Sequence, residues 1–273
     1  MENTIYPSVI DVVVDAKLPY FVKSYETLIA QTVQDFELVL VVGYPGTEVR
    51  AFMAEQEPMF KLTIVQEPPR EKYPCRASAN NLGMDAASGN LYIGTQDDIL
   101  YPPNWVESHI EHHKGGGPYF VMSRVVGALT GGTQAEEDEF WSRISDTMRY
   151  PSVMRWQYAS GHSFSLPMGM ARKCRHNELY NGFWGFEDIQ WAYDCFNAGC
   201  EFVIDTNVAV VHQDHGDRQE ERWASDQDGF WQWLSERSRN RRLFYGLNGF
   251  EPETGIVLNE FGLPGMLDYT TVE

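Results

Sequence analysis

The sequence predicts an α/β protein, and two observations carry this prediction. Residues 1–98 alternate between short apolar runs, which are typical of strands, and amphipathic segments, which are typical of helices. Residues 181–215 then place a helical segment, an apolar run and a histidine in that order. A chain of 273 residues that is 43% hydrophobic is long enough for one sizeable core or two tightly joined halves.

The first helix is predicted over residues 19–31. Pro19 suits its first position, because a helix leaves the N–H at that place unbonded and proline has none. The side chains that we expect to be buried are Phe21, Tyr25, Leu28 and Ile29. This helix therefore has one apolar face that can pack against a sheet.

A later helix is predicted to begin near Glu187 and to stop at Gly199. Its expected buried stripe follows the helical period and consists of Ile189, Ala192, Tyr193 and Phe196. Glu187 and Asp188 then lie in the first turn. Acidic residues there often do no more than stabilise the helix dipole, by a few tenths to about 1 kcal/mol.

The segment after this helix predicts a strand that ends at a histidine. Residues 202–204 and 208–211 are apolar and indicate a buried strand or a strand pair, and His212 follows directly. Strand ends are where α/β proteins keep their chemistry. A lone histidine in this place is more often a packing residue, so its significance depends on a second cluster.

An acidic pair supplies that second cluster. Asp97 and Asp98 follow the apolar run LYIG, and Pro102 and Pro103 suit a turn that leads into another helix. Adjacent carboxylates in a turn are commonly a solvated cap, but they are also the ligands that hard divalent cations prefer. Together with one imidazole, these carboxylates are suited to bind manganese or magnesium.

In their order along the chain, these segments resemble the metal-dependent glycosyltransferases of the GT-A fold, most closely the inverting enzymes of family 2. SVIDVVV and YETLIAQTVQDFELVLVV resemble the opening strand, helix and second strand. NNLGMDAASGNLYIGTQDD resembles the helix and strand before the DxD metal motif, and NGFWGFEDIQWAYDC resembles the acceptor-side ED motif. VVHQDH resembles the late metal-binding histidine, and its HQD triplet is similar to chondroitin-polymerase-type domains.

The resemblance covers roughly residues 8–215 and implies a particular architecture. We expect a Rossmann-like three-layer αβα sandwich with a mixed, mostly parallel central sheet. Residues 1–215 would form one catalytic domain, with a nucleotide-binding half over 1–98 and an acceptor half over 99–215. Residues 216–273 would form a C-terminal helix and tail that pack on this domain.

The resemblance also implies roles for the two clusters. Asp98 and His212 would bind Mn²⁺ or Mg²⁺, which stabilises the charge of the departing diphosphate. Asp188 would take the proton of the acceptor hydroxyl, and Glu187 would orient Asp188 or the acceptor. On the acceptor side, Trp184 would offer an apolar face to a sugar ring, and His162 would face the acceptor, although a buried, hydrogen-bonded histidine is an equal alternative.

The donor side departs from the family pattern. The turn after the second strand is Gly43, Tyr44, Pro45, Gly46, where the family has an acidic turn that reads uracil, and Val13 stands where a proline is usual. UDP-sugars are the commonest donors of the family, but this turn leaves the base open. The residues expected at the donor are Asp97, Gln96, Arg76, Asp15 and Tyr44, with Gln96 at the first acidic position of the DxD motif. Arg70 and Lys72 share the loop of Arg76 and are alternatives to it.

Composition narrows the class of partner. Lys and Arg number 21 against 39 Asp and Glu, and this net charge of −18 argues against nucleic acid and against an anionic membrane surface. Nowhere do 18 apolar residues follow one another, so no membrane span is predicted. The four cysteines lack CxxC spacing, and reduced thiols in a soluble, cytoplasmic protein fit them best.

Three functions are compatible with these features. The first is transfer of a sugar from a nucleotide-sugar donor to a hydroxyl acceptor, glycan or other, with inversion. The second is a sugar nucleotidyltransferase, which would normally carry a glycine-rich loop with a basic residue after its first strand, where this chain has DAKLPY. The third is a nucleotide-sugar or glycan-binding module with a decayed site, which Gln96 and the Gly43 turn favour.

Overall fold

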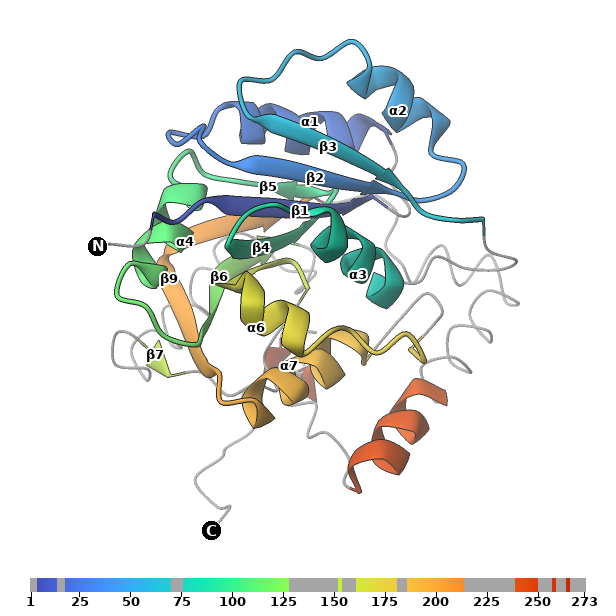
Figure 1. The fold of residues 1–273 in the computed structure, drawn as a ribbon, viewed down its shortest axis with the longest axis vertical. Helices are drawn as coiled ribbons and strands as arrows, with labels where there is room; N and C mark the ends of the chain where they lie inside the picture. The colour runs from blue at the N-terminus through green and yellow to red at the C-terminus, as the bar shows by residue number, and fades with distance from the viewer. Residues whose placement is uncertain are drawn as a thin grey trace.

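The computed structural model describes residues 4–13, 18–69, 76–127, 152–153, 161–180, 186–213, 239–249, 257–258 and 264–265. These residues form an α/β fold around one mixed sheet of nine strands. Eight strands follow the order β3-β2-β1-β4-β8-β6-β9-β5, and β7 pairs with β9. The strands β3, β2, β1 and β4 can be followed in that order from the top of Figure 1 downward. The predicted fold class, with a mixed and mostly parallel sheet, is confirmed.

The first half of the chain alternates strands and helices, as predicted. Its strands are β1 (Pro7–Val13), β2 (Glu37–Val42), β3 (Lys61–Gln66) and β4 (Leu91–Gln96), and all four pair in parallel. Its helices are α1 (Leu18–Ile29), α2 (Thr47–Met53) and α3 (Arg76–Ala86). Because parallel strands share a direction, the carboxyl ends of β1 and β4 meet at one edge of the sheet.

The second half adds strands of both directions. They are β5 (Ile99–Leu100), β6 (Tyr119–Gly127), β7 (Ser152–Val153), β8 (Ser163–Pro167) and β9 (Glu201–His212). β8 is antiparallel to β4 and β6, whereas β6 and β9 are parallel. The end of β9 and the beginning of β8 therefore lie at the same edge of the sheet as the end of β4.

The remaining elements cover the sheet. The helices of the second half are α4 (Trp105–His113), α6 (Met168–Lys173) and α7 (Glu187–Asn197), and a further helix spans residues 239–248. This last helix contacts α7, since Asn248 donates a hydrogen bond to Gln190 over 2.8 Å. The short strands β10 (Val257–Leu258) and β11 (Pro264–Gly265) form a separate pair. In the part of the chain described here, no helix is long and apolar enough to cross a membrane.

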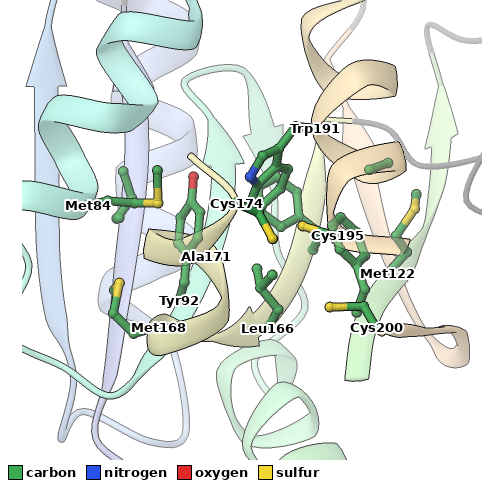
Figure 2. Packing of buried hydrophobic residues seen from close by; sticks show 14 of the residues in the cluster. Met84, Tyr92, Met122, Leu166, Met168, Ala171, Cys174, Trp191, Cys195 and Cys200 are labelled. Atoms are coloured by element: carbon green, nitrogen blue, oxygen red, sulfur yellow. The ribbon is translucent and has the colours of Figure 1, made fainter. Parts of the chain in front are cut away.

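Two hydrophobic clusters cover the two faces of the sheet, which gives three layers. Alternate residues of β1 divide between them, with Ile10 and Val12 on one side and Val9 and Val13 on the other. The side chains of α3, α6 and α7 build the first cluster, which Figure 2 shows around Tyr92, Leu166 and Trp191. Those of α1, α2 and α4 build the second.

The buried face of α1 agrees with the sequence except at its end. Phe21, Tyr25 and Leu28 are at most 1% exposed, whereas Ile29 is 43% exposed and Ser24 is buried in its place. The prediction for Ile29 was wrong. At about 100° per residue, Ile29 lies at the margin of the stripe that Phe21 and Leu28 define.

The stripe predicted for α7 was rotated from the real one. The helix buries Gln190, Trp191, Ala192 and Cys195, whereas Phe196 is 50% exposed and Ile189 and Tyr193 are partly buried. Trp191 has the largest side chain on the helix and fills the space beside the imidazole of His176, which stacks on it at 4.2 Å. The predicted stop is present, because Gly199 has a φ of 95°.

The apolar runs after α7 form one strand of 12 residues and not a pair. The pairing of β9 with β6 shifts between Ser123, which faces Asp205, and Arg124, which faces Ala209. The extra residues form an irregularity of the bulge type, which lets a single strand continue past two polar positions. Its last residue is His212, as the sequence predicted.

Candidate active site

Asp98 and His212 meet at the carboxyl edge of the sheet. β4 ends at Gln96, the acidic pair forms the turn to β5, and β5 pairs with β9 so that Ile99 lies opposite His212. This pairing brings His212 Nε2 to 3.3 Å from Asp98 Oδ2. The next backbone N–H, that of Gln213, donates to the Asp98 carbonyl over 2.9 Å and fixes the register.

Their chemistry is suited to a divalent cation that a diphosphate also ligates. No group of three His, Cys, Asp or Glu side chains in the described ranges is arranged to hold a metal ion, so Asp98 and His212 stand as a pair. Mg²⁺ and similar cations are typically bound by one or two carboxylates together with substrate phosphates. Both side chains are 14% exposed, which leaves them accessible to such a ligand.

Gln96 and Asp97 precede this pair and differ in environment. Asp97 is buried, and its pKa is raised well above the ordinary value by burial first and then by the neighbouring carboxylates of Asp98 and Asp11. The guanidinium of Arg76 opposes this shift. The Gln96 carbonyl accepts a hydrogen bond from the Tyr101 hydroxyl over 3.2 Å, which anchors the end of β4.

Asp188 lies in the first turn of α7, as predicted. Burial and then the charge of Glu187 raise the pKa of the Asp188 carboxyl to about 7, while Arg76 lowers it. Arg76 thus acts electrostatically on both Asp97 and Asp188, so the first residue of α3 lies within electrostatic reach of both acids. A carboxyl with a pKa near neutrality is suited to accept a proton from a substrate.

The backbone that leads into α7 is strained. Phe186, the residue before Glu187, has a φ of 77°, a left-handed conformation that a bulky side chain rarely adopts. Its side chain is buried near Phe244, with the ring centroids 6.3 Å apart. Such conformations persist only where the surroundings enforce them, and they concentrate at functional sites. This unusual conformation stands directly before Glu187 and Asp188, the first two residues of α7.

His162 lies beside the pair formed by Asp98 and His212. Its ring centroid is 5.2 Å from that of His212, in an edge-to-face arrangement with an interplanar angle of 67°. Burial and then the proximity of His212 lower the pKa of His162 to about 3, so its imidazole is neutral. We expected this residue on the acceptor side, with a buried, hydrogen-bonded histidine as an equal alternative, and the structure places its ring against that of His212.

Asp11 is a member of this region to which the sequence assigned no role. It lies in β1 opposite Thr95 of β4 and is fully buried, and neither of its carboxylate oxygens hydrogen-bonds to any residue that the structure describes. Burial, and then the Asp98 carboxylate, raise its pKa to about 8. The available signal was a single acid inside the run SVIDVVV, which has no place in an apolar strand core.

Three other predicted residues have a different status. Tyr44 lies in the turn after β2, two strands away from β4 in the sheet, and is 62% exposed. Asp15 and Trp184 lie outside the described residues. The predicted site residues that the structure brings together are therefore Gln96, Asp97, Asp98, Arg76, His162, Glu187, Asp188 and His212.

Solved structures of similar fold include a mannosyltransferase and two proteins in complex with UDP or a UDP-sugar. GalNAc-T7 with UDP, GalNAc and Mn²⁺ has a TM-score of 0.60 at 13% identity, over 78% of this chain and 44% of that one. A mannosyltransferase from Pyrobaculum calidifontis, in complex with GDP-Man and Mn²⁺, has a TM-score of 0.59 at 17% identity, over 77% and 57%. TarS from S. aureus, in complex with UDP-GlcNAc, has a TM-score of 0.56 at 11% identity, over 77% and 59%.

At these identities the likeness establishes the fold, which is of the GT-A type. The chain spans less than two thirds of each of these three proteins. The comparison with curated protein sequences gives no match. The model of the family described as Glycosyl transferase family 2 matches residues 8–173, which is more than half of the chain. The protein therefore belongs to glycosyl transferase family 2.

Proposed function

We propose that the protein transfers a sugar from a nucleotide-sugar donor to a hydroxyl acceptor, with inversion and with the help of a divalent cation. The observation that carries the proposal is the pairing of His212 with Asp98 at 3.3 Å, at the strand edge where α/β proteins bind ligands. The family assignment supports the reaction class. The raised pKa of Asp188 supports the presence of a proton acceptor in the same region.

Asp98 and His212 would hold the cation, Mn²⁺ or Mg²⁺, and a bound cation would neutralise charge on the leaving diphosphate. Arg76 is the cation of the protein that we assign to the same phosphates, since it opens α3 and acts electrostatically on Asp97 and Asp188. With a net charge of −18, the chain offers few other cations for this purpose.

Asp188 would act as the base. Its carboxylate takes the proton of the acceptor hydroxyl while the hydroxyl oxygen forms a bond to the anomeric carbon. The bond from that carbon to the diphosphate breaks, and the nucleoside diphosphate leaves with the electron pair. Attack from the face opposite the leaving group inverts the anomeric configuration. Burial, and then the charge of Glu187, raise the pKa of Asp188 to about 7, which suits it to accept the proton.

One experiment tests both whether the protein binds a nucleotide and which nucleotide base it selects. Two of the solved relatives are in complex with UDP or a UDP-sugar, and one is in complex with GDP-Man. Calorimetric titration of the full chain with UDP, GDP, CDP and dTDP, each with and without Mn²⁺, tests them together. We expect one diphosphate to bind tightly, with at least about a tenfold dependence on Mn²⁺. UDP is our first candidate.

A binding module with a decayed site is the second candidate. It is favoured by Gln96 in place of an acid and by the Gly43 to Gly46 turn, which lacks the acid that reads uracil in the family. If none of the four nucleoside diphosphates binds in the titration, the binding module is favoured over the enzyme. Mn²⁺-dependent binding together with release of free nucleoside diphosphate from a matching nucleotide sugar would exclude it.

A further inference from the structure

The backbone of His162 is fixed from the side of β4. β8 begins at Ser163, which pairs with Thr95 in the antiparallel ladder, and the Thr95 hydroxyl donates to the His162 carbonyl over 3.0 Å. Thr95 is itself buried and hydrogen-bonds to the Tyr101 hydroxyl over 2.7 Å. The position of His162 is therefore tied to the strand that carries the acidic pair.

Ser163, the residue after His162, is held by a series of buried hydrogen bonds that begins at α4. Trp105 Nε1 donates to Ser163 Oγ over 2.9 Å, and Ser163 donates to Ser123 Oγ over 2.9 Å. Ser123 in turn contacts His109 Nε2 over 3.0 Å. Because an indole N–H can only donate, the first link has one possible direction. The start of β8 is thus held on two sides, which fixes the backbone from which the His162 ring extends.

The ring that occupies this place touches His212. The two imidazoles meet edge to face, at a centroid distance of 5.2 Å and an interplanar angle of 67°. A metal-binding histidine is effective only when its ring orientation is fixed by surrounding groups.

We propose that His162 is a positioning residue, whose ring packs against His212 and holds His212 Nε2 toward Asp98, and that it thereby sets the affinity for the divalent cation. The inference rests on the metal site of the proposed function. It differs from direct ligation by His162, for which no three side chains within the described ranges are suitably arranged. It also differs from a contact with the acceptor.

The test is binding of Mn²⁺ alone. It is measured as the loss of the electron paramagnetic resonance signal of free Mn²⁺ when the full chain is added. The variants are His162→Ala, which removes the ring, and His162→Phe, which keeps a ring edge but has no nitrogen. We expect the alanine variant to bind Mn²⁺ about tenfold more weakly, and the phenylalanine variant to stay within about twofold of the wild type. Ser165→Ala serves as the matched control, since Ser165 lies in the same strand and contacts His109 and His113.

Each outcome has a distinct meaning. Wild-type affinity in His162→Ala overturns the inference, and an equal loss in His162→Phe overturns packing in favour of a nitrogen ligand. If His162→Ala does not fold, His162→Asn replaces it, because asparagine also lacks the ring edge. We then expect His162→Asn to bind Mn²⁺ about tenfold more weakly than the wild type. A wild-type chain that binds no Mn²⁺, either alone or with the nucleoside diphosphate that the calorimetric titration selects, refutes the metal site itself, and the inference falls with it. A loss in His212→Ala without a loss in His162→Ala leaves the proposed function intact and refutes only the positioning role.

Discussion

His212 Nε2 lies 3.3 Å from Asp98 Oδ2, although the two residues end different halves of the chain. The short strand β5 makes this contact possible, because it follows the acidic turn directly and pairs with the end of β9. The backbone hydrogen bond from Gln213 to Asp98 locks the arrangement. One side chain from each half therefore completes the candidate metal site.

The first prediction concerns this pair. Asp98→Asn and His212→Ala should each weaken Mn²⁺-dependent binding of the preferred nucleoside diphosphate by at least about tenfold, because each removes one of two protein ligands. Calorimetric titration in the presence of Mn²⁺ measures the effect. Asp35→Asn, an exposed acid in the loop before β2, is the control and should bind as the wild type does. Unchanged binding in both site variants would refute the metal assignment.

The second prediction separates catalysis from binding. Asp188→Asn should lower the rate of sugar transfer by about 10²–10⁴-fold, since the amide cannot accept the acceptor proton. Mn²⁺-dependent nucleotide binding should persist, because within the described ranges no hydrogen bond or ion pair joins Asp188 to Asp98 or His212. Turnover of a nucleotide sugar measures the first effect and calorimetry the second. Full transfer activity in the purified variant would show that another group is the base.

The third prediction is a pH profile. Burial, followed by the charge of Glu187, raises the pKa of Asp188 to about 7, and the base is active only when deprotonated. The rate at low donor concentration should therefore rise between pH 6 and 8 and level off above the pKa. Glu187→Gln removes one cause of the shift and should move the rising limb to lower pH. A limb that stays in place in this variant would argue against Asp188 as the titrating group.

The fourth prediction concerns Asp11 and stability. Its folded-state pKa, about 8, lies above the ordinary value of 3.8, so the folded state binds the proton more tightly. The stabilisation that results is fully present below about pH 4 and is lost as the pH rises through 8, by at most about 1.4 kcal/mol per pH unit.

Urea unfolding without metal at pH 5, 6.5 and 8 checks this. Asp97 titrates in the same direction, so the wild-type curve alone is not diagnostic. Asp11→Asn, which is neutral at every pH, should show a smaller decline than the wild type. Parallel declines in the two proteins would mean that Asp11 does not carry the effect.

The fifth prediction tests the packing beneath the site. A Cβ at Gly94 of β4 would lie 2.0 Å from Cζ of Phe164, whose ring also contacts Tyr92, Phe120 and Trp191. Gly94→Ala should destabilise the fold by about 1–3 kcal/mol or more, because the ring stack cannot move aside. Gly169→Ala in α6 is the matched control, since no atom lies within 4 Å of its Cβ position. It should be neutral or slightly stabilising, as thermal unfolding will show.

The sequence was sufficient to predict a strand or a helix wherever its ends depend on residues close by in the chain. The strand before Asp97 and Asp98, the strand that ends at His212 and the helix that begins at Glu187 all follow from local apolar runs and a glycine stop. The order of these segments was enough to indicate the family. Local patterns work here because strand ends and first helical turns are defined within a few residues.

The buried face of α7 could not be obtained in this way. Its apolar residues are spread around the helix, and the choice of Trp191 and Cys195 over Phe196 depends on the ring of His176 and on the strands below. The same holds for Ile29 at the end of α1. Which apolar side chain is buried is a property of the partner surface as much as of the helix.

By itself the sequence determined the fold class, the places of the acids and the histidine, and the family that these places resemble. Tertiary structure alone decided that Asp98 contacts His212 and that His162 packs on His212. It also decided that Asp11 is buried so near to Asp98 that the Asp98 charge raises its pKa. The reason is that sheet order and register bring together residues that are distant along the chain, and no local period encodes which strand pairs with which.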